Sequence, residues 1–389
     1  MIARCASRND VIGALAIGKD RERPIAVRGA GPAEDDDGAV VVDLSALNAI
    51  EIDPASRTVS VGPGVTWAEL DGATQEHGLA VTGARLSRLG VAGVALGDGS
   101  GWLERALGPT GGDLVGAEVV LADGDVVEAG DDGDLLWALR GAGRHVGVVT
   151  RVDLRLHPVG PLLLAGFLSF PRDRALEVAT AYRDFMDQAP DGVGGGLLLG
   201  AGLGGVCTVV FSYLGPVEAG EEAIAPLRDL GPSLDAVAPV PYRNLQHMWD
   251  DSNPVGARAY RRGAFLRALP DAGLAAAIGR ADMPAASLSY VFLQPLGGAL
   301  GRVEDMALRI PDAPWAYQCE GLWPPVESLD AGQRAWVDGF ADALGEESLD
   351  AAYPSLARSR GAAYGRDGCE RLAELARRYD PRNVFGGMS

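Results

Sequence analysis

The feature that most constrains this chain is an alternation of short apolar runs with glycine-rich turns between Pro24 and Pro158. The runs are rich in β-branched residues and bordered by Gly, Pro and Asp, which is typical of short β-strands. One stretch, AIEIDPASRTVSVGPG, predicts a hairpin with its turn at 53–56. Helical patterns interrupt the strands at 66–77 and from Leu135. This half of the chain therefore favours a sheet covered by a few helices.

The pattern changes near Gly160. Strand-like runs follow, interrupted by an amphipathic helix at 174–189, and further helices are expected at 331–344 and 368–379. The expected strands are LLLAGFLSFP, GGVCTVVFSYLG, ARAYRRGAFLRAL, ALRIP and WAYQCEGLW. Together the two halves predict an α+β protein with two sheets and a boundary near residue 160.

Composition excludes several classes of partner. The net charge is −19 and the pI about 4.6, so the surface repels nucleic acid and anionic membranes. The four cysteines are far apart and match no zinc spacing, and no pair of histidines has metal-ligand spacing. We find neither a signal-peptide core nor an apolar run long enough to span a bilayer, and we expect a cytoplasmic protein. The oligomeric state is not indicated.

Two glycine clusters carry the chemical signal. GVAGVALGDGSGW covers 90–102 and LRGAGRHVGVVT covers 139–150. A backbone without Cβ atoms can pass close to a flat or anionic ligand, although glycine turns between strands are also common without a ligand. Neither cluster fits GxGxxG in a βαβ unit, and GxxxxGK[ST] is absent, so neither a Rossmann site nor a P-loop is indicated.

Ordered blocks along nearly the whole chain resemble one family. They include VRGAG, VVVDLSALNAIEIDPASRTVSVGPG, GVAGVALGDGSGWLERALG, AEVVLADGDVVEA, DLLWALRGAGRHVGVVTRVDLRLHPVGP and RYDPRNVF. In this order they resemble the FAD-linked oxidases of the berberine-bridge-enzyme-like group, in the vanillyl-alcohol oxidase and p-cresol methylhydroxylase superfamily. The resemblance implies a two-part FAD-binding domain, 1–160 and 350–389, flanking a substrate domain, 161–349, whose antiparallel sheet covers the flavin.

The resemblance also implies which residues contact FAD. They are Arg28, Gly29 and Gly31 in the pyrophosphate loop; Gly90, Gly93, Gly97, Gly99, Gly101 and Trp102 beside the flavin ring; Gly143, His145, Gly147 and Val149 in the second glycine turn and strand; and Asn383 in the C-terminal motif.

The chain departs from the family at the flavin tethers. Many relatives bond the flavin to a histidine in the first loop, where this chain has Pro32, and to a cysteine before the second glycine segment, where 83–90 contains none. Any FAD is therefore expected to be non-covalent. Glu34 and Asp35 to Asp37 follow the first loop and oppose a pyrophosphate unless they point into solvent. The resemblance also leads us to expect a segment before the first strands and an Asn-containing tail, neither of which is found between Met1 and Ser389.

The function expected from the resemblance is oxidation of a bulky, secondary-metabolite-like small molecule by an FAD-dependent oxidase. Acid–base candidates come from the surfaces that face the flavin in the family: Tyr260, Tyr317, Glu320, Tyr353 and Tyr364. Each tyrosine also fits a core position. If FAD is absent, the alternative is a flavin-independent cyclase or isomerase, for example a cycloaddition catalyst that acts by holding a reactive conformer. A third alternative is a binding protein without activity.

Overall fold

The N-terminal portion begins with a small parallel sheet. The computed structural model describes residues 1–31, 38–130, 133–200, 206–282, 288–302 and 304–385. Strands β1 (Ile2–Arg4), β2 (Ile25–Arg28) and β3 (Val40–Asp43) pair in the order β1-β3-β2, and helix α1 (Arg8–Asp20) connects the first two. Because Val11, Leu15, Val40 and Val42 are buried together, the helix packs on the sheet through one apolar face.

A five-stranded antiparallel sheet follows, in the order β4-β5-β9-β7-β8. Its strands are β4 (Ile50–Asp53), β5 (Thr58–Val61), β7 (Leu114–Val120), β8 (Val126–Ala129) and β9 (Val148–Arg155). The β4–β5 hairpin closes as predicted, with Asp53 Oδ1 accepting bonds from the backbone amides of Ala55 and Ser56. Short strands β6 (Leu79–Ala80) and β10 (His157–Pro158) pair separately.

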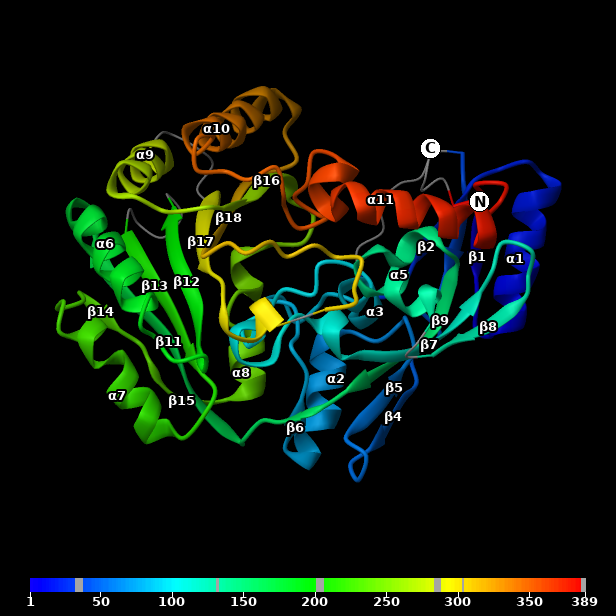
Figure 1. The fold of residues 1–389 in the computed structure, drawn as a ribbon, viewed down its shortest axis with the longest axis horizontal. Coiled ribbons are helices and arrows are strands. Elements are labelled where there is room, and N and C mark those ends of the chain that lie inside the picture. The colour runs from blue at the N-terminus through cyan, green and yellow to red at the C-terminus, as the bar shows by residue number, and fades with distance from the viewer. Residues whose placement is uncertain (32–37, 131–132, 201–205, 283–287, 303, 386–389) are drawn as a thin grey trace.

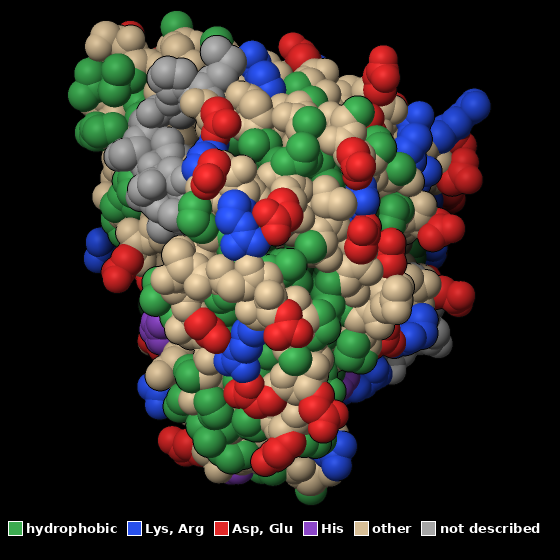
Figure 2. Space-filling view, turned by 90° about the vertical axis from the view of Figure 1, so that its left-hand side faces the viewer, with side chains coloured by type: hydrophobic (Ala, Val, Ile, Leu, Met, Phe, Trp, Pro, Cys, Tyr) green, Lys and Arg blue, Asp and Glu red, His purple; other side chains and the backbone are tan. Residues whose placement is uncertain are grey.

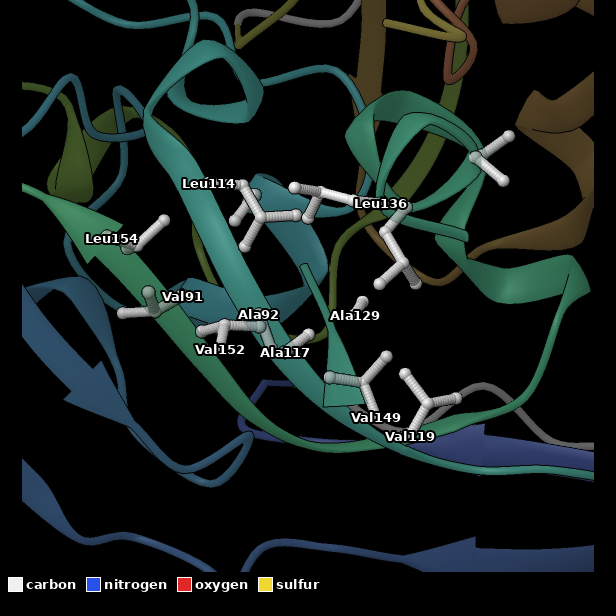
Figure 3. Close-up of a cluster of buried hydrophobic side chains, with 14 of the residues drawn as sticks. Val91, Ala92, Leu114, Ala117, Val119, Ala129, Leu136, Val149, Val152 and Leu154 are labelled. Atoms are coloured by element: carbon white, nitrogen blue, oxygen red, sulfur yellow. The ribbon is translucent and has the colours of Figure 1, made fainter. Parts of the chain in front are cut away.

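Helices α2 (Trp67–Thr74), α3 (Val91–Ala95), α4 (Glu104–Leu107) and α5 (Asp134–Ala142) belong to the same portion. Helix α2 starts with a capping box formed by Thr66 and Glu69, and Gly78 ends its last turn in the left-handed conformation. Figure 3 shows the core that results: Val91 and Ala92 of α3 and Leu136 of α5 lie over Ala117, Val119, Val149 and Val152 of the sheet.

The second portion is an eight-stranded antiparallel sheet in the order β14-β11-β13-β12-β17-β18-β16, with β15 also paired to β11. Its strands are β11 (Leu162–Pro171), β12 (Val193–Gly200), β13 (Val206–Tyr213), β14 (Leu234–Asp235), β15 (Ala238–Pro241), β16 (Arg258–Leu266), β17 (Tyr290–Pro295) and β18 (Trp315–Trp323). Helices α6 (Ala175–Met186), α7 (Val217–Arg228), α9 (Asp271–Ala281) and α10 (Asp330–Ala343) lie on the outer side, whereas the other face is turned toward the N-terminal portion (Figure 1). The short helix α8 (Tyr242–His247) lies on this inner side.

The chain then returns to its beginning. Helix α11 (Arg360–Tyr379) runs back beside α5, where Arg371 forms an ion pair with Asp134 at 2.6 Å. Beyond it, the Val384 carbonyl accepts a bond from Ile25 N in β2, so the C-terminal segment lies against the first sheet. The division at about residues 160 and 350 remains our proposal for the domain limits.

The α+β fold class is confirmed. Several elements match the predicted limits closely, including WAYQCEGLW, which is β18. ALRIP is a correction, because 307–311 form no strand. Ala307 N and Leu308 N instead bond to carbonyls of α5, Trp137 and Arg140, so this segment is fixed against a helix. Figure 2 shows acidic and basic side chains interspersed over the outer side of the second portion.

Candidate active site

A cavity of about 240 Å³ lies where the inner face of the large sheet meets the glycine-rich segment of the N-terminal portion. One wall is formed by 84–100 of the N-terminal portion. The opposite wall is formed by residues of β16, β17 and β18 and by residues of 353–356, in the segment between α10 and α11. The residues that line the cavity include Arg85, Gly93, Gly97, Asp98, Gly99, Trp249, Arg261, Tyr290, Gln294, Gln318, Glu320 and Tyr353.

The glycine wall exposes backbone to the cavity. A Cβ on Gly93, in α3, would meet no atom within 4 Å, so the helix presents open space at this point. Gly99 has φ +63° and its Cβ position lies 2.9 Å from Thr110 N, so a side chain there would be strained and crowded. Between the glycines, Asp98 Oδ1 accepts a bond from Ser355 N at 3.0 Å, which joins this wall to the C-terminal segment.

The sheet wall is polar because of strand periodicity. Along β18, Tyr317 and Cys319 belong to the core under the outer helices, whereas Gln318 and Glu320 face the cavity. On β17, Tyr290 and Gln294 face the cavity in the same way, and Val291 and Leu293 point to the helices. The alternation places functional groups on one face without disturbing the core on the other.

Glu320 is the centre of the first polar cluster. It is 3% exposed, and its Oε2 accepts from Gln318 Nε2 at 2.5 Å and from the Tyr290 hydroxyl at 3.4 Å. Arg261 approaches Oε1 at 3.0 Å and is itself partly exposed. Burial, followed by the neighbouring charge of Glu320, raises the pKa of Tyr290 well above its ordinary value. The three donors fix the orientation of this carboxylate on the cavity wall, where it can reach a proton of a bound molecule.

A second polar cluster lies at the other side of the cavity. Arg85 pairs with the buried Glu104 at 2.9 Å and lies over the rings of Trp102 and Phe292. Gln294 Nε2 bonds Glu104 and also donates to the Tyr353 hydroxyl at 3.4 Å. Burial raises the pKa of both Glu104 and Tyr353, so the phenol stays protonated and can donate a hydrogen bond into the cavity.

The segment before α3 is fixed to the large sheet's connecting loop. Asp250 accepts hydrogen bonds from Ser87 N at 2.9 Å and from Ser87 Oγ at 2.5 Å, and its Oδ2 also lies 2.8 Å from His247 Nδ1. Arg88 donates to the carbonyls of Asp250 and Asn253. These bonds join the two portions beside the glycine-rich wall of the cavity.

The residues present fit FAD. The cavity presents glycine backbone on one wall and hydrogen-bonding side chains on the other, as a flat ring with polar edges requires. The first loop lies next to it, since a Cβ on Gly90, which caps α3, would clash with the Ala30 carbonyl. A Cβ on Gly31, at φ +120°, would meet no atom within 4 Å, so this loop can approach an anionic group through its backbone.

Comparison with known proteins agrees with this geometry. Residues 1–130 match the family model described as FAD binding domain. The fold is therefore that of FAD-linked oxidases, with an FAD-binding domain at residues 1–130. It is 28% identical to (R)-6-hydroxynicotine oxidase of Paenarthrobacter nicotinovorans, over 99% of this chain and 89% of that protein. The crystal structure of 6-hydroxy-D-nicotine oxidase from Arthrobacter nicotinovorans superposes with a TM-score of 0.88 at 26% identity, covering 100% of this chain and 91% of that one.

Further matches are shorter or more distant. An FAD-linked oxidoreductase of Dictyostelium discoideum is 30% identical over 59% of this chain, and the match spans about half (51%) of that protein. A berberine-bridge-enzyme-like protein of Physcomitrella patens has a TM-score of 0.90 at 20% identity, covering 100% of this chain and 90% of that one, which shows a common fold. The resemblance to FAD-linked oxidases is thus confirmed, and the cyclase alternative gains no support from these relatives.

The predicted cofactor residues of this oxidase fold take different positions. Gly93, Gly97 and Gly99 line the cavity. Arg28 does not line it. Its guanidinium forms an ion pair with the buried Asp43 at 2.8 Å, between strands β2 and β3 of the first sheet. Acidic residues 34–37 and Pro32 lie outside the described residues.

The other predicted cofactor residues lie outside the lining of this cavity. Cβ atoms on Gly29, Gly101, Gly143 and Gly147 would meet Pro63, Gly83, Leu96 and Val119 respectively, so these glycines allow close contact between segments. Trp102 and Val149 are buried in the two cores, and Asn383 N bonds the Asp380 carbonyl. His145 lines a separate cavity of about 290 Å³ beside the start of α11.

The five acid–base candidates separate into two groups. Glu320 and Tyr353 face the cavity with the partners described above. Tyr317 also borders it, but its ring packs on Phe340 of α10 at 5.4 Å, on the helix side of the sheet. Tyr260 donates to Asp338 of α10 at 3.1 Å, and Tyr364 donates to the Gly141 carbonyl at 3.3 Å. We therefore remove Tyr260 and Tyr364 from the proposed catalytic set, because neither lines the cavity.

Four residues of the cavity wall were not among the sequence-based candidates: Arg261, Tyr290, Gln294 and Gln318. The signal for Gln318 was present, because Gln318 and Glu320 alternate with apolar residues in WAYQCEGLW. The run SYVFLQP contains the same alternation at Tyr290 and Gln294. Arg261 has no comparable pattern in the sequence.

Within the described residues, no cluster of three or more His, Cys, Asp or Glu has the arrangement of a metal site. Nor does any helix of the described part combine the length and apolar character needed to cross a bilayer.

Proposed function

We propose that this protein is an FAD-dependent oxidase that removes two electrons from a bulky, secondary-metabolite-like small molecule. The observation that carries the proposal is Glu320, a buried carboxylate held by Gln318, Tyr290 and Arg261 on the wall of the junction cavity. It faces a glycine-rich backbone wall that belongs to the oxidase fold. The chain therefore combines a base with a surface suited to a flavin ring.

FAD, when bound, supplies the acceptor for a hydride leaving a C–OH, C–N or C–H centre, and its electrons pass on to oxygen. The chain's own residues handle the proton. Glu320 Oε1 or Oε2 takes the proton that the substrate's hydroxyl or amine releases, while Arg261 stabilises the carboxylate before transfer. On the other side, the protonated Tyr353, held by Gln294, can donate a hydrogen bond that orients the substrate.

We propose that FAD binds without a covalent bond. No cysteine occurs at 83–90, and the residue after the first loop's last glycine is Pro32. The described residues that line the cavity include neither histidine nor cysteine. Hydrogen bonds from Ser87 and Arg88 to the 250–253 segment hold this wall of the cavity in place without a covalent bond to the flavin. The four free cysteines suit a reducing compartment, and we propose the cytoplasm.

The substrate class follows from the cavity and from the relatives. Relatives with nearly full coverage include an oxidase of (R)-6-hydroxynicotine. The cavity here offers a carboxylate, a phenol and an amide around a space partly bounded by aromatic rings. These groups fit a ring-containing substrate with a hydroxyl or amine next to the bond that is oxidised.

Oxygen uptake tests this proposal. The FAD-loaded protein is assayed against a panel of aryl alcohols, cyclic amines and phenols, with hydrogen peroxide measured in parallel. We expect at least one class to be consumed with matching oxygen uptake. Cyclisation or isomerisation of a panel member at an equal rate with and without FAD would instead support the cyclase.

A further inference from the structure

A second cavity lies on the same inner face of the large sheet, away from the glycine wall. Its volume is about 490 Å³, within the range of small-molecule sites. Phe167, Leu198, Val210, Leu234 and Met248 provide apolar walls, and none of the described residues that line it is charged. Its polar groups are hydroxyls that already have partners: Ser169 Oγ lies 3.3 Å from Thr208 Oγ1, and Ser233 Oγ donates to the Ser169 carbonyl. The space therefore suits an apolar group.

Strand pairing connects this cavity to the candidate active site. Ser169 is opposite Thr208, Thr208 opposite Leu198, Leu198 opposite Phe292, and Phe292 opposite Gln318. Paired residues point to the same face, so these five form one row across the sheet. The row begins in the second cavity and ends at Gln318 beside Glu320. Two strand spacings, roughly 10 Å, separate Leu198 from Gln318.

Trp249 packs on Phe292, one of the five residues of the row, and lines both cavities. Its ring is 5.0 Å from Phe292 and 5.5 Å from Tyr290, centre to centre. It follows α8 in the short segment that also contains Asp250 and Ser252. Among the described residues, Trp249 alone lines both cavities, and Phe292, which is 1% exposed, lines neither. A molecule that extends from one cavity to the other would therefore have to displace the Trp249 ring.

We propose that the second cavity is the site for an apolar arm of the substrate. The substrate class is then an amphipathic molecule, with a hydroxyl or amine head at Glu320 and an alkyl, prenyl or aryl arm that passes Trp249 and lies over Leu198 and Thr208. This proposal rests on the proposed function for the identity of the head group. The cavity's own chemistry, apolar and without charge, fixes the nature of the arm.

A series of 1-alkanols from butanol to decanol serves as the probe, with binding to the FAD-loaded protein measured by calorimetry. Affinity is expected to rise about fourfold for each methylene buried, until the chain fills the second cavity. Thr208→Phe and Ser169→Phe place a ring in that cavity from two different strands, where aromatic residues are well tolerated. Both variants should flatten the rise for the longer alkanols and leave butanol binding unchanged.

Leu162→Phe is the matched control, because Leu162 is on β11 but exposed and outside both cavities. It should bind the whole series as the unmodified protein does. Equal binding of long alkanols by Thr208→Phe, Ser169→Phe and the control would overturn the proposal, and so would an equal loss of short and long chains. Calorimetry does not need turnover, so a failure to oxidise any substrate is distinguishable from a failure of this pocket.

Discussion

At the scale of single residues, the site depends on the difference between two buried carboxylates. Glu104 is neutralised in place by Arg85 and bonded by Gln294, so it acts on the substrate only through those two side chains. Glu320 faces the cavity directly and keeps a partly exposed arginine as its counter-ion. We therefore assign the proton transfer to Glu320 and regard Glu104 as a positioning residue.

Glu320→Gln tests this assignment. The amide keeps the shape and some hydrogen bonds but cannot take a proton, so kcat should fall about 100-fold or more. The bound FAD, measured by absorbance, should stay constant. Glu370→Gln changes an exposed glutamate on α11 and should leave kcat unaffected. If Glu320→Gln kept at least a third of the activity, another group would have to be the base.

At the scale of elements, α2 and α8 join the two portions through a buried polar pair. Gln246 Nε2 donates to Asp71 Oδ2 at 3.0 Å, and Asp71 is 2% exposed. Burial raises the pKa of Asp71 to about 7, which the bond from Gln246 only partly offsets. The folded protein therefore holds a proton that the unfolded chain, with an ordinary Asp pKa near 3.8, has already released.

The free energy of unfolding should consequently decrease as pH rises from about 4 to 7, by up to about 4 kcal/mol from this group. Asp71→Asn removes the titration while the amide oxygen can still accept from Gln246. The stability of the variant relative to the unmodified protein should increase over this pH range, measured by urea unfolding at pH 5 and pH 8. A stability difference that is the same at both pH values would contradict a raised pKa.

Helix α3 permits a second test at this scale. Gly93 has helical geometry, and a Cβ there would point into open space in the cavity, so Gly93→Trp should fold yet fill the flavin's place. We expect FAD binding to weaken by at least tenfold, followed by flavin fluorescence during titration. Gly13→Trp in α1 is the control, because that glycine is also helical and open but exposed. FAD affinity unchanged in Gly93→Trp would mean that the ring does not lie against α3.

At the scale of the whole molecule, the sequence could predict the architecture but only part of the site. The β4–β5 hairpin and β18 were predictable because strand periodicity and turn residues are local signals. Glu320 was predictable from the resemblance together with its strand. Arg261 was not, since it faces Glu320 only through the pairing of β16 with β18, a long-range register that no local pattern specifies.

The same limit explains the two tyrosines that the structure places elsewhere. Tyr260 lies on β16, where a shift of one residue exchanges the two faces of the sheet, and it points to Asp338 of α10. Tyr364 lies just before Gly365, whose φ of +69° interrupts α11 and directs the tyrosine to Gly141. Neither the face that Tyr260 takes on β16, the edge strand of the large sheet, nor the turn at Gly365 was evident from composition or spacing.

The most direct test of non-covalent FAD binding at the junction cavity is a visible absorption spectrum. The purified protein is loaded with FAD, excess FAD is removed, and the spectrum is recorded. The protein is then denatured in acid and passed through a filter that retains the polypeptide, and the spectra of both fractions are recorded. We expect the two visible bands of an oxidised flavin on the native protein. After acid, all of the colour should pass through the filter, because neither 83–90 nor Pro32 offers a tether. A colourless native protein would contradict FAD binding at the junction cavity, and colour that stays with the denatured chain would contradict a non-covalent flavin.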